Sequence, residues 1–242
     1  MPKPKLPNRN FKWTPKLAYI IGLLTTDGNL SKDGRHITMR SSEIQLLKTF
    51  NDCLDKILDK SYKIARSKND SLAKKPCYRV QFSNVQFYRW LLKIGLFPAK
   101  TYTIGKLKIV DRYFKDFLRG HLDGDGSIIT YKDFYNTYKN PKYIYTRLWV
   151  NFISASGIHI KWLRKKIFNL LSINGHLSQG KIYNKQTVGR WKLKFAKKES
   201  IKLLRWIYYQ PNLPCLKRKR IIAEKVLEKI TKEKRRKYMR VK

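Results

Sequence analysis

Hydrophobic residues follow two spacings in this chain, and both spacings occur in each half. Apolar positions at intervals of three and four residues predict helices, whereas alternation with polar positions predicts strands with one buried face. The helices predicted in this way cover residues 43–58, 86–94, 158–171 and 199–207. The predicted strands cover residues 37–40, 62–66, 78–82, 148–152, 175–183 and 188–195.

The pattern recurs along the chain, which indicates a tandem duplication. Residues 19–28 and 117–126 are helix-like segments with a central glycine, and both end in Asp-Gly, with the last Asp of each 98 residues apart. The positions that follow match at an offset of 113, so the second copy holds 15 additional residues, which we place in the stretch 131–146. We therefore predict an α+β fold of two pseudo-symmetric repeats, residues 1–110 and 111–242. Each repeat has the order α-β-α-β-β-α, with its helices on one face of an antiparallel sheet.

Composition indicates the kind of partner. The chain has 55 Lys and Arg residues against 16 Asp and Glu, a net charge of +39, which points to a polyanion and argues against an ordinary metabolic enzyme. Aromatic residues make up 13% of the chain, so the charge belongs to a folded protein. No apolar run reaches the ~18 residues that would span a membrane. The odd count of three cysteines predicts a reducing, intracellular setting, either a bacterial cytoplasm or an organelle.

The predicted strands carry the binding hypothesis. Alternation places Tyr, Val and Phe of residues 78–82 toward the helices and leaves Arg79 and Gln81 on the open face, and Lys192 and Lys194 take the same positions in the second copy. A basic antiparallel sheet can lie in a DNA major groove, although a solvated sheet face is the ordinary alternative. The candidate DNA contacts are Arg40, Lys63, Arg66, Arg79, Gln81, Arg147, Trp149, Asn151, Lys181, Arg190, Lys192 and Lys194.

Asp27 and Asp125 are the candidate chemical groups. An Asp-Gly after a helix is usually a cap, but duplication of the position favours a function. If the two helices pack side by side along Gly22 and Gly120, the carboxylates meet at one end of the interface. Two carboxylates beside phosphates require cations between them, and metal-assisted phosphodiester hydrolysis uses that arrangement.

Residues 20–28 and 118–126 resemble the two signature motifs of the LAGLIDADG homing endonucleases in their single-chain, two-repeat form. The resemblance implies a saddle of two sheets over DNA, with the motif helices between the halves. It also implies Mg²⁺, replaceable by Ca²⁺ or Mn²⁺ in vitro, held by Asp27 and Asp125 together with the backbone carbonyls of Thr26 and Gly124. By the same resemblance, Lys194 and Gln81 lie near the catalytic water.

Other motif positions differ between the copies. The earlier motif Asp is present as Asp123 and is replaced by Thr25 in the first copy, so we interpret Asp123 as structural. Arg119 and His121 stand where the family usually has apolar residues. The four histidines show no metal-ligand spacing, and a catalytic histidine is not expected.

The implied function is a monomeric endonuclease that cuts both strands of a long pseudo-palindromic double-stranded DNA target and so promotes the mobility of an intron or intein. Two alternatives stay open, namely a maturase that binds intron RNA and a non-cleaving DNA-binding regulator of the same fold. Both motif Asp residues are present in this chain, which argues against a maturase or regulator that has lost the ability to cleave DNA. No membrane partner is expected. Residues 1–13 are predicted to be a basic arm and residues 231–242 a basic tail that adds affinity for phosphates, with a solvated tail as the alternative.

Overall fold

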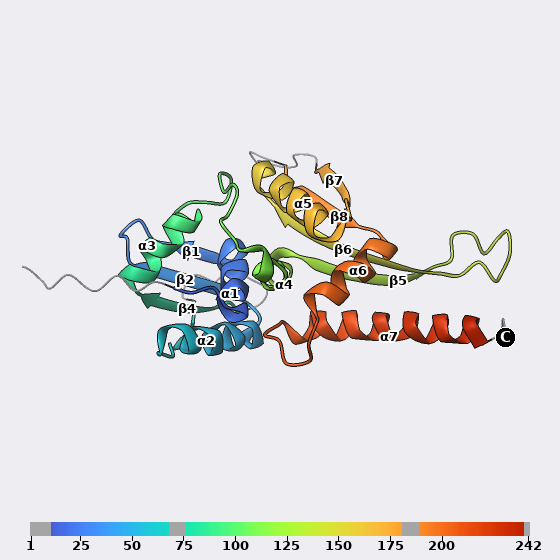
Figure 1. Cartoon of the computed structure of the whole chain (residues 1–242), viewed down its shortest axis with the longest axis horizontal. Helices are drawn as coiled ribbons and strands as arrows, with labels where there is room; N and C mark the ends of the chain where they lie inside the picture. Colours follow the sequence, from blue (N-terminus) through green and yellow to red (C-terminus); the bar gives the residue numbers. More distant parts are fainter. Residues whose placement is uncertain (1–10, 68–75, 181–188, 240–242) are drawn as a thin grey trace, which may run out of the picture.

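The computed structural model describes residues 11–67, 76–180 and 189–239, with side chains described up to residue 232. Two repeats follow each other in the same order of elements (Figure 1). The first contains α1 (Pro15–Thr26), β1 (Gly28–Leu30), β2 (His36–Ser41), α2 (Ile44–Leu58), β3 (Ile64–Arg66), β4 (Tyr78–Ser83) and α3 (Val85–Ile94). The second contains a short 3-10 turn (Asp111–Tyr113), α4 (Phe114–Asp125), β5 (Ser127–Asp133), β6 (Tyr145–Ser154), α5 (Gly157–Leu171), β7 (His176–Gln179), β8 (Trp191–Phe195) and α6 (Lys197–Ile207), and is followed by α7 (Lys217–Met239).

Each repeat has one four-stranded antiparallel sheet, ordered β1-β2-β4-β3 in the first and β5-β6-β8-β7 in the second. The strand registers are equivalent as well. Ile37 pairs with Phe82 in the first sheet, and Val150 pairs with Phe195 in the second. Val150 lies 113 residues after Ile37, and Phe195 lies 113 residues after Phe82. The predicted α+β duplication is therefore confirmed, including its strand register.

One strand of each repeat was missing from the predicted order. The structure has α-β-β-α-β-β-α, because a strand follows each motif helix directly. β1 is only three residues long, too short to show an alternation. β5 extends into the stretch where the additional residues were placed, and these residues lengthen the β5–β6 hairpin. In Figure 1 this hairpin projects beyond the second sheet, alongside α7.

The two motif helices pack against each other at the junction of the repeats (Figure 1). Thr14 caps α1 by accepting a hydrogen bond from the backbone N–H of Leu17, and Pro15 begins the helix. A Cβ atom at Gly22 would overlap the backbone carbonyl of Phe117, and one at Gly120 would overlap the carbonyl of Tyr19. The absence of these side chains allows the helix backbones to touch.

Arg119 explains one departure from the usual motif. Its side chain is fully buried and forms an ion pair with Asp116, with 2.8 Å between Nη2 and Oδ1. The same guanidinium donates to the carbonyls of Ile207 and Pro214 at 2.9 and 2.8 Å. A buried charge is tolerated when its donors are satisfied in this way. Arg119 therefore ties α4 to the end of α6 and to the segment before α7.

Asp123, like Arg119, is buried and hydrogen-bonded to other elements. It is 2% exposed, and its Oδ2 accepts hydrogen bonds from the Tyr19 hydroxyl at 2.9 Å and from the Leu216 backbone N–H at 2.7 Å. These bonds join α1, α4 and the start of α7. Within the described residues, no helix is both long enough and apolar enough to cross a bilayer.

The helix contact predicts a strong effect of one methyl group. Gly22→Ala should lower the free energy of unfolding by about 3 kcal/mol or more, because the new Cβ meets backbone that cannot rotate away. Gly105→Ala is the matched control, since its Cβ would meet only Ile158 Cγ2 at an ordinary 3.8 Å. Chemical denaturation of both variants measures the difference. Equal stability of the two variants would contradict the backbone contact.

Candidate functional site

Two carboxylates lie together where the motif helices end. Asp27 follows the last residue of α1, and its backbone N–H bonds to the Leu23 carbonyl at 2.9 Å. Asp125 is the last residue of α4. A Cβ atom at Gly124 would lie 2.6 Å from Oδ2 of Asp27, so the end of α4 abuts the Asp27 side chain. The contact of the helices thus brings one carboxylate from each repeat to one place.

Their surroundings make ionisation costly. Burial raises the pKa of Asp27 from 3.8 to about 6, and repulsion from Asp125 acts in the same direction. The Thr26 hydroxyl, 3.1 Å from Oδ2 of Asp27, opposes this shift. Asp125 is exposed at the end of α4, yet neighbouring protein atoms desolvate its carboxyl enough to raise the pKa of this group as well. A pair of such carboxylates favours a nearby positive charge.

Two lysines supply positive charge from within the protein. Lys100 is 6% exposed and donates to the carbonyl of Gly28, the residue after Asp27. Lys219 is 4% exposed and donates to the carbonyl of Gly126, the residue after Asp125, at 2.7 Å. The same amino group reaches the carbonyls of Leu122 and Asp123 at 2.6 and 2.8 Å and that of Gly124 at 3.3 Å.

Burial lowers the pKa of both Lys100 and Lys219 to about 8, while Asp27 and Asp125 raise it. The carbonyl partners hold each amino group as a donor at the C-terminal end of a motif helix, where the helix dipole favours a cation. These lysines therefore offset the negative charge of the carboxylate pair. Arg190 adds a further attraction that lowers the pKa of Asp125.

The oxygen atoms at this point fit a hard divalent cation. Two carboxylates and the backbone carbonyls of Thr26 and Gly124 are ligands of the kind that Mg²⁺ and Ca²⁺ take. No cluster of three or more His, Cys, Asp or Glu side chains occurs in the part of the chain that the structure describes. An ion between Asp27 and Asp125 would therefore need water and phosphate oxygens to complete its coordination. The contact between the carbonyl of Gly124 and Lys219 is long, at 3.3 Å.

A cavity of about 60 Å³ adjoins the carboxylates and is lined by side chains that include Thr26, Lys100, Asp125, His121 and His159. The two histidines stack at 5.3 Å between ring centroids, with 3.2 Å between their Nε2 atoms. Burial lowers the pKa of both rings, that of His159 to about 4, so they are neutral. They form a packed pair behind the site, which accounts for the second departure from the usual motif.

The open face of the first sheet carries most of its predicted DNA contacts. Arg40 pairs with Arg79, and Gln81 pairs with Thr38, so these side chains share the face away from the helices. Lys63 is exposed just before β3. Arg66 is exposed but pairs with Tyr78, whose alternation places it with the buried Val80. Arg66 therefore stands outside the row formed by the other cations.

The second sheet presents a similar row. Lys194 pairs with Asn151, and its amino group lies 3.5 Å from the centroid of the Trp149 ring. Asn151 is 2% exposed and donates to the Ser127 hydroxyl at 3.0 Å, so it forms part of the floor of this face.

The other predicted contacts of the second repeat lie around this row. Lys192 lies on the same face as Lys194, and Arg190 is exposed just before β8. Arg147 is bonded to Asp133 at 2.7 Å. Lys181 lies outside the described residues.

Sequence reasoning missed the two lysines next to the carboxylates. Lys100 and Lys219 are the lysines that act on the pKa of both Asp residues. The placement of Lys194 and Gln81 near a catalytic water stays a prediction. A signal was present, because both lysines lie in or just after the Pro-containing connections that end the two repeats. Their approach to the motif helices depends on the fold and could not be read from spacing.

Comparison with known proteins identifies similar folds and one matching domain family. Residues 14–95 match the family described as LAGLIDADG-like domain. No curated protein sequence matches the chain. The I-LtrWI LAGLIDADG homing endonuclease bound to target DNA is similar in structure, with a TM-score of 0.60, 14% identity, and coverage of 91% of this chain and 91% of the other. The homing endonuclease I-WcaI bound to its DNA recognition sequence is similar at a TM-score of 0.57 and 14% identity, covering 91% of this chain and 95% of the other.

Full-length DUF199/WhiA from Thermatoga maritima is also similar, with a TM-score of 0.56 and 17% identity over 94% of this chain. The present chain spans 63% of the length of that protein. At these identities the solved structures show a shared fold. The resemblance drawn from the two motifs is confirmed: residues 14–95 match the LAGLIDADG-like domain, and the whole chain has the two-repeat fold of the LAGLIDADG homing endonucleases.

Proposed function

We propose that this protein is a site-specific endonuclease that uses divalent metal ions to cut both strands of a double-stranded DNA target. The observation that carries the proposal is the pair Asp27 and Asp125 at the junction of two sheets with cationic open faces, with a buried lysine beside each. Both carboxylates come from one chain, which supports action as a monomer. A role in spreading an intron or intein belongs to the same proposal.

Binding to DNA would use the open sheet faces. Arg40, Arg79, Lys192 and Lys194 form rows of donors that can reach base edges and phosphates in a major groove. Because the two sheets meet at the motif helices, the carboxylates come to lie under the centre of a duplex that spans both faces. The solved complexes of I-LtrWI and I-WcaI with DNA support this mode of binding.

In the proposed mechanism, Asp27 and Asp125 would hold the divalent ions together with the carbonyls of Thr26 and Gly124. Bound Mg²⁺ would neutralise phosphate charge and acidify water. Lys100 and Lys219 contribute fixed positive charge that keeps both carboxylates ionised as phosphates approach. Thr26 orients Oδ2 of Asp27 by contact at 3.1 Å. Each carboxylate belongs to one repeat, and each would serve one strand.

Replacement of either carboxylate tests the chemistry. Asp27→Asn or Asp125→Asn should lower double-strand cleavage by at least about 100-fold while duplex binding stays within a few-fold, because the amide keeps the shape but is a weaker metal ligand. Asp52→Asn, at an exposed position of α2, is the control and should cleave like the wild type. The measurement is cleavage of a randomised duplex library in Mg²⁺ beside a binding assay.

Two results would separate the alternatives. Loss of binding in either Asp variant, with unchanged cleavage per bound complex, would contradict a catalytic role. Duplex that is bound but uncut by the wild type as well as the variants would identify a non-cleaving DNA-binding protein of this fold.

Metal binding should also appear in stability. The pKa of Asp27 is raised from 3.8 to about 6, so the folded protein loses stability as pH rises through that window in metal-free buffer. Asp27→Asn should remove this loss and be about 1–2 kcal/mol more stable than the wild type at pH 7 in EDTA. Mg²⁺ should stabilise the wild type more than the variant. The measurement is the thermal unfolding of the wild type and Asp27→Asn over a range of pH, in EDTA and in Mg²⁺. An equal stabilisation of both proteins by Mg²⁺ would contradict the metal site.

The buried lysine of the second repeat has a separate prediction. Lys219→Met removes the donor from four carbonyls at the end of α4 and should lower unfolding free energy by about 2–4 kcal/mol. Cleavage by the fraction that remains folded should also fall. Lys217→Met, at an exposed position two residues earlier, is the control. Wild-type stability and cleavage in Lys219→Met would show that this lysine contributes neither.

A further inference from the structure

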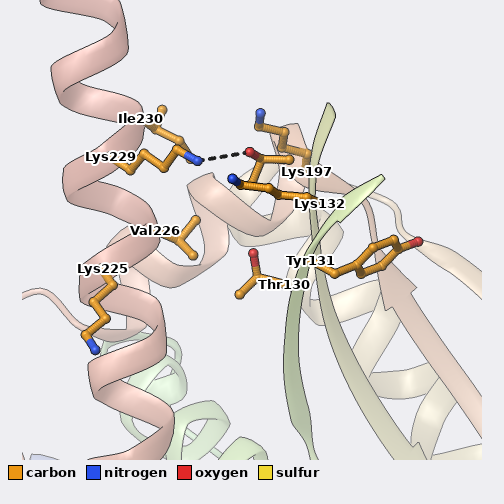
Figure 2. A pocket seen from close by; sticks show the side chains of 9 residues that line it. Thr130, Tyr131, Lys132, Lys197, Lys225, Val226, Lys229 and Ile230 are labelled. Carbon is orange, nitrogen blue, oxygen red and sulfur yellow. Dashed lines mark hydrogen bonds between the residues drawn. The ribbon is translucent and has the colours of Figure 1, made fainter. Parts of the chain in front are cut away.

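A second basic site lies away from the carboxylates, between the β5–β6 hairpin and α7 (Figure 2). This back pocket has a volume of about 280 Å³. Its lining residues are Thr130, Tyr131, Lys132, Thr146, Lys197, Lys225, Val226, Lys229 and Ile230. Four of them are lysines, contributed by β5, α6 and α7, and none is acidic. Figure 2 shows Lys132 and Lys229 entering the gap between β5 and α7 from opposite sides.

The back pocket opens on the side of the sheet opposite to the proposed DNA face. Thr130 pairs with Leu148, and Lys132 pairs with Thr146, so these four side chains share one face of the hairpin. Leu148 is 1% exposed and faces the core, which identifies this face as the one covered by helices. Lys194 and Trp149 lie on the other face. A duplex that lies on the open sheet faces would therefore leave the back pocket accessible.

The charges of the back pocket are poorly balanced by the protein. Lys229 donates to the Thr146 hydroxyl at 3.2 Å, and no carboxylate of the described side chains forms an ion pair with it. Two of the nearby acidic side chains have other partners, since Glu224 bonds to Arg220 at 2.6 Å and Asp133 to Arg147 at 2.7 Å. Several ammonium groups around one concave surface attract phosphates. Val226 and Ile230 form an apolar floor beneath them.

The adjoining hairpin tip carries exposed aromatic rings. Tyr135 and Tyr138 are 79% and 72% exposed, and their rings meet edge to face at 6.4 Å. Phe134, Tyr143 and Tyr145 are also exposed. The tip belongs to the additional residues of the second repeat, and the shorter β1–β2 connection has no counterpart. Exposed rings beside cations are suited to unpaired bases, which stack on them, whereas the bases of a duplex are already stacked.

We propose that the back pocket and the hairpin tip form a second nucleic-acid site that binds an unpaired segment of RNA. Phosphates would contact Lys132, Lys197, Lys225 and Lys229, and bases would stack on Tyr135 and Tyr138. The Thr130 hydroxyl donates to the Arg147 carbonyl at 3.0 Å and the Thr146 hydroxyl accepts from Lys229 at 3.2 Å, so Thr130 can still accept from a ribose 2′-OH and Thr146 can still donate to one. Such contacts would favour RNA over single-stranded DNA. This site is separate from the proposed cleavage centre and goes beyond that function.

The test measures binding of a labelled oligouridine of about 20 nucleotides, a length that covers the site, together with binding of a duplex DNA. Lys132→Glu/Lys225→Glu should weaken RNA binding by about 10-fold or more at physiological salt. The control Lys56→Glu/Lys93→Glu changes net charge equally at exposed positions of α2 and α3 and should have a much smaller effect. Tyr135→Ala/Tyr138→Ala should weaken RNA binding by about 5-fold or more and leave duplex binding unchanged.

Duplex binding in every variant reports that the protein is folded, and saturating duplex should leave the RNA bound. Three results would overturn the proposal. Equal losses in the pocket and control variants would show only an effect of total charge. Displacement of the RNA by duplex would place both on one surface. Equal affinity for single-stranded DNA of the same length would remove the assignment to RNA.

Discussion

The contact between α1 and α4 is the constraint on which the rest of this structure depends. Gly22 and Gly120 leave no room for a side chain, so each helix rests on the backbone of the other. The contact fixes where both helices end, and the chain continues from each end directly into the first strand of a sheet. The spacing of the carboxylates and the placement of the two sheets therefore have one common cause. A change at this contact would move the two carboxylates and the open sheet faces together.

That close approach has an electrostatic consequence. Bringing two carboxylates to the ends of touching helices is unfavourable, because burial and repulsion raise the pKa of Asp27 to about 6. The protein offsets part of this cost with Lys100 and Lys219, whose own pKa values fall to about 8 on burial. Each lysine also serves as the donor for carbonyls at a helix end, so it stabilises the fold while it compensates the site. Structural and chemical roles cannot be separated at these positions.

The sequence predicted the two repeats, the equivalent register of their strands and the proximity of Asp27 and Asp125, because these depend on local periodicity and on repeated motifs. It missed β1 and β5, since three residues are too few for an alternation and β5 lay in the apparent insertion. It also missed Lys100 and Lys219, which reach the motif helices from connections far along the chain. The contact of Lys194 with the Trp149 ring was likewise not predicted. Contacts between residues so far apart in the chain produce no recognisable pattern in the sequence.

The two repeats differ most where the duplication is least constrained. Their cores share a strand register, since Ile37 with Phe82 is equivalent to Val150 with Phe195. Outside the cores, the first repeat has a short β1–β2 connection, whereas the second has a long aromatic hairpin supported by α7. A change in the helix contact would displace both carboxylates. A hairpin at the edge of a sheet, in contrast, can lengthen without disturbing the helix contact. The fold thus allows one repeat to gain a long hairpin while the symmetric centre stays fixed.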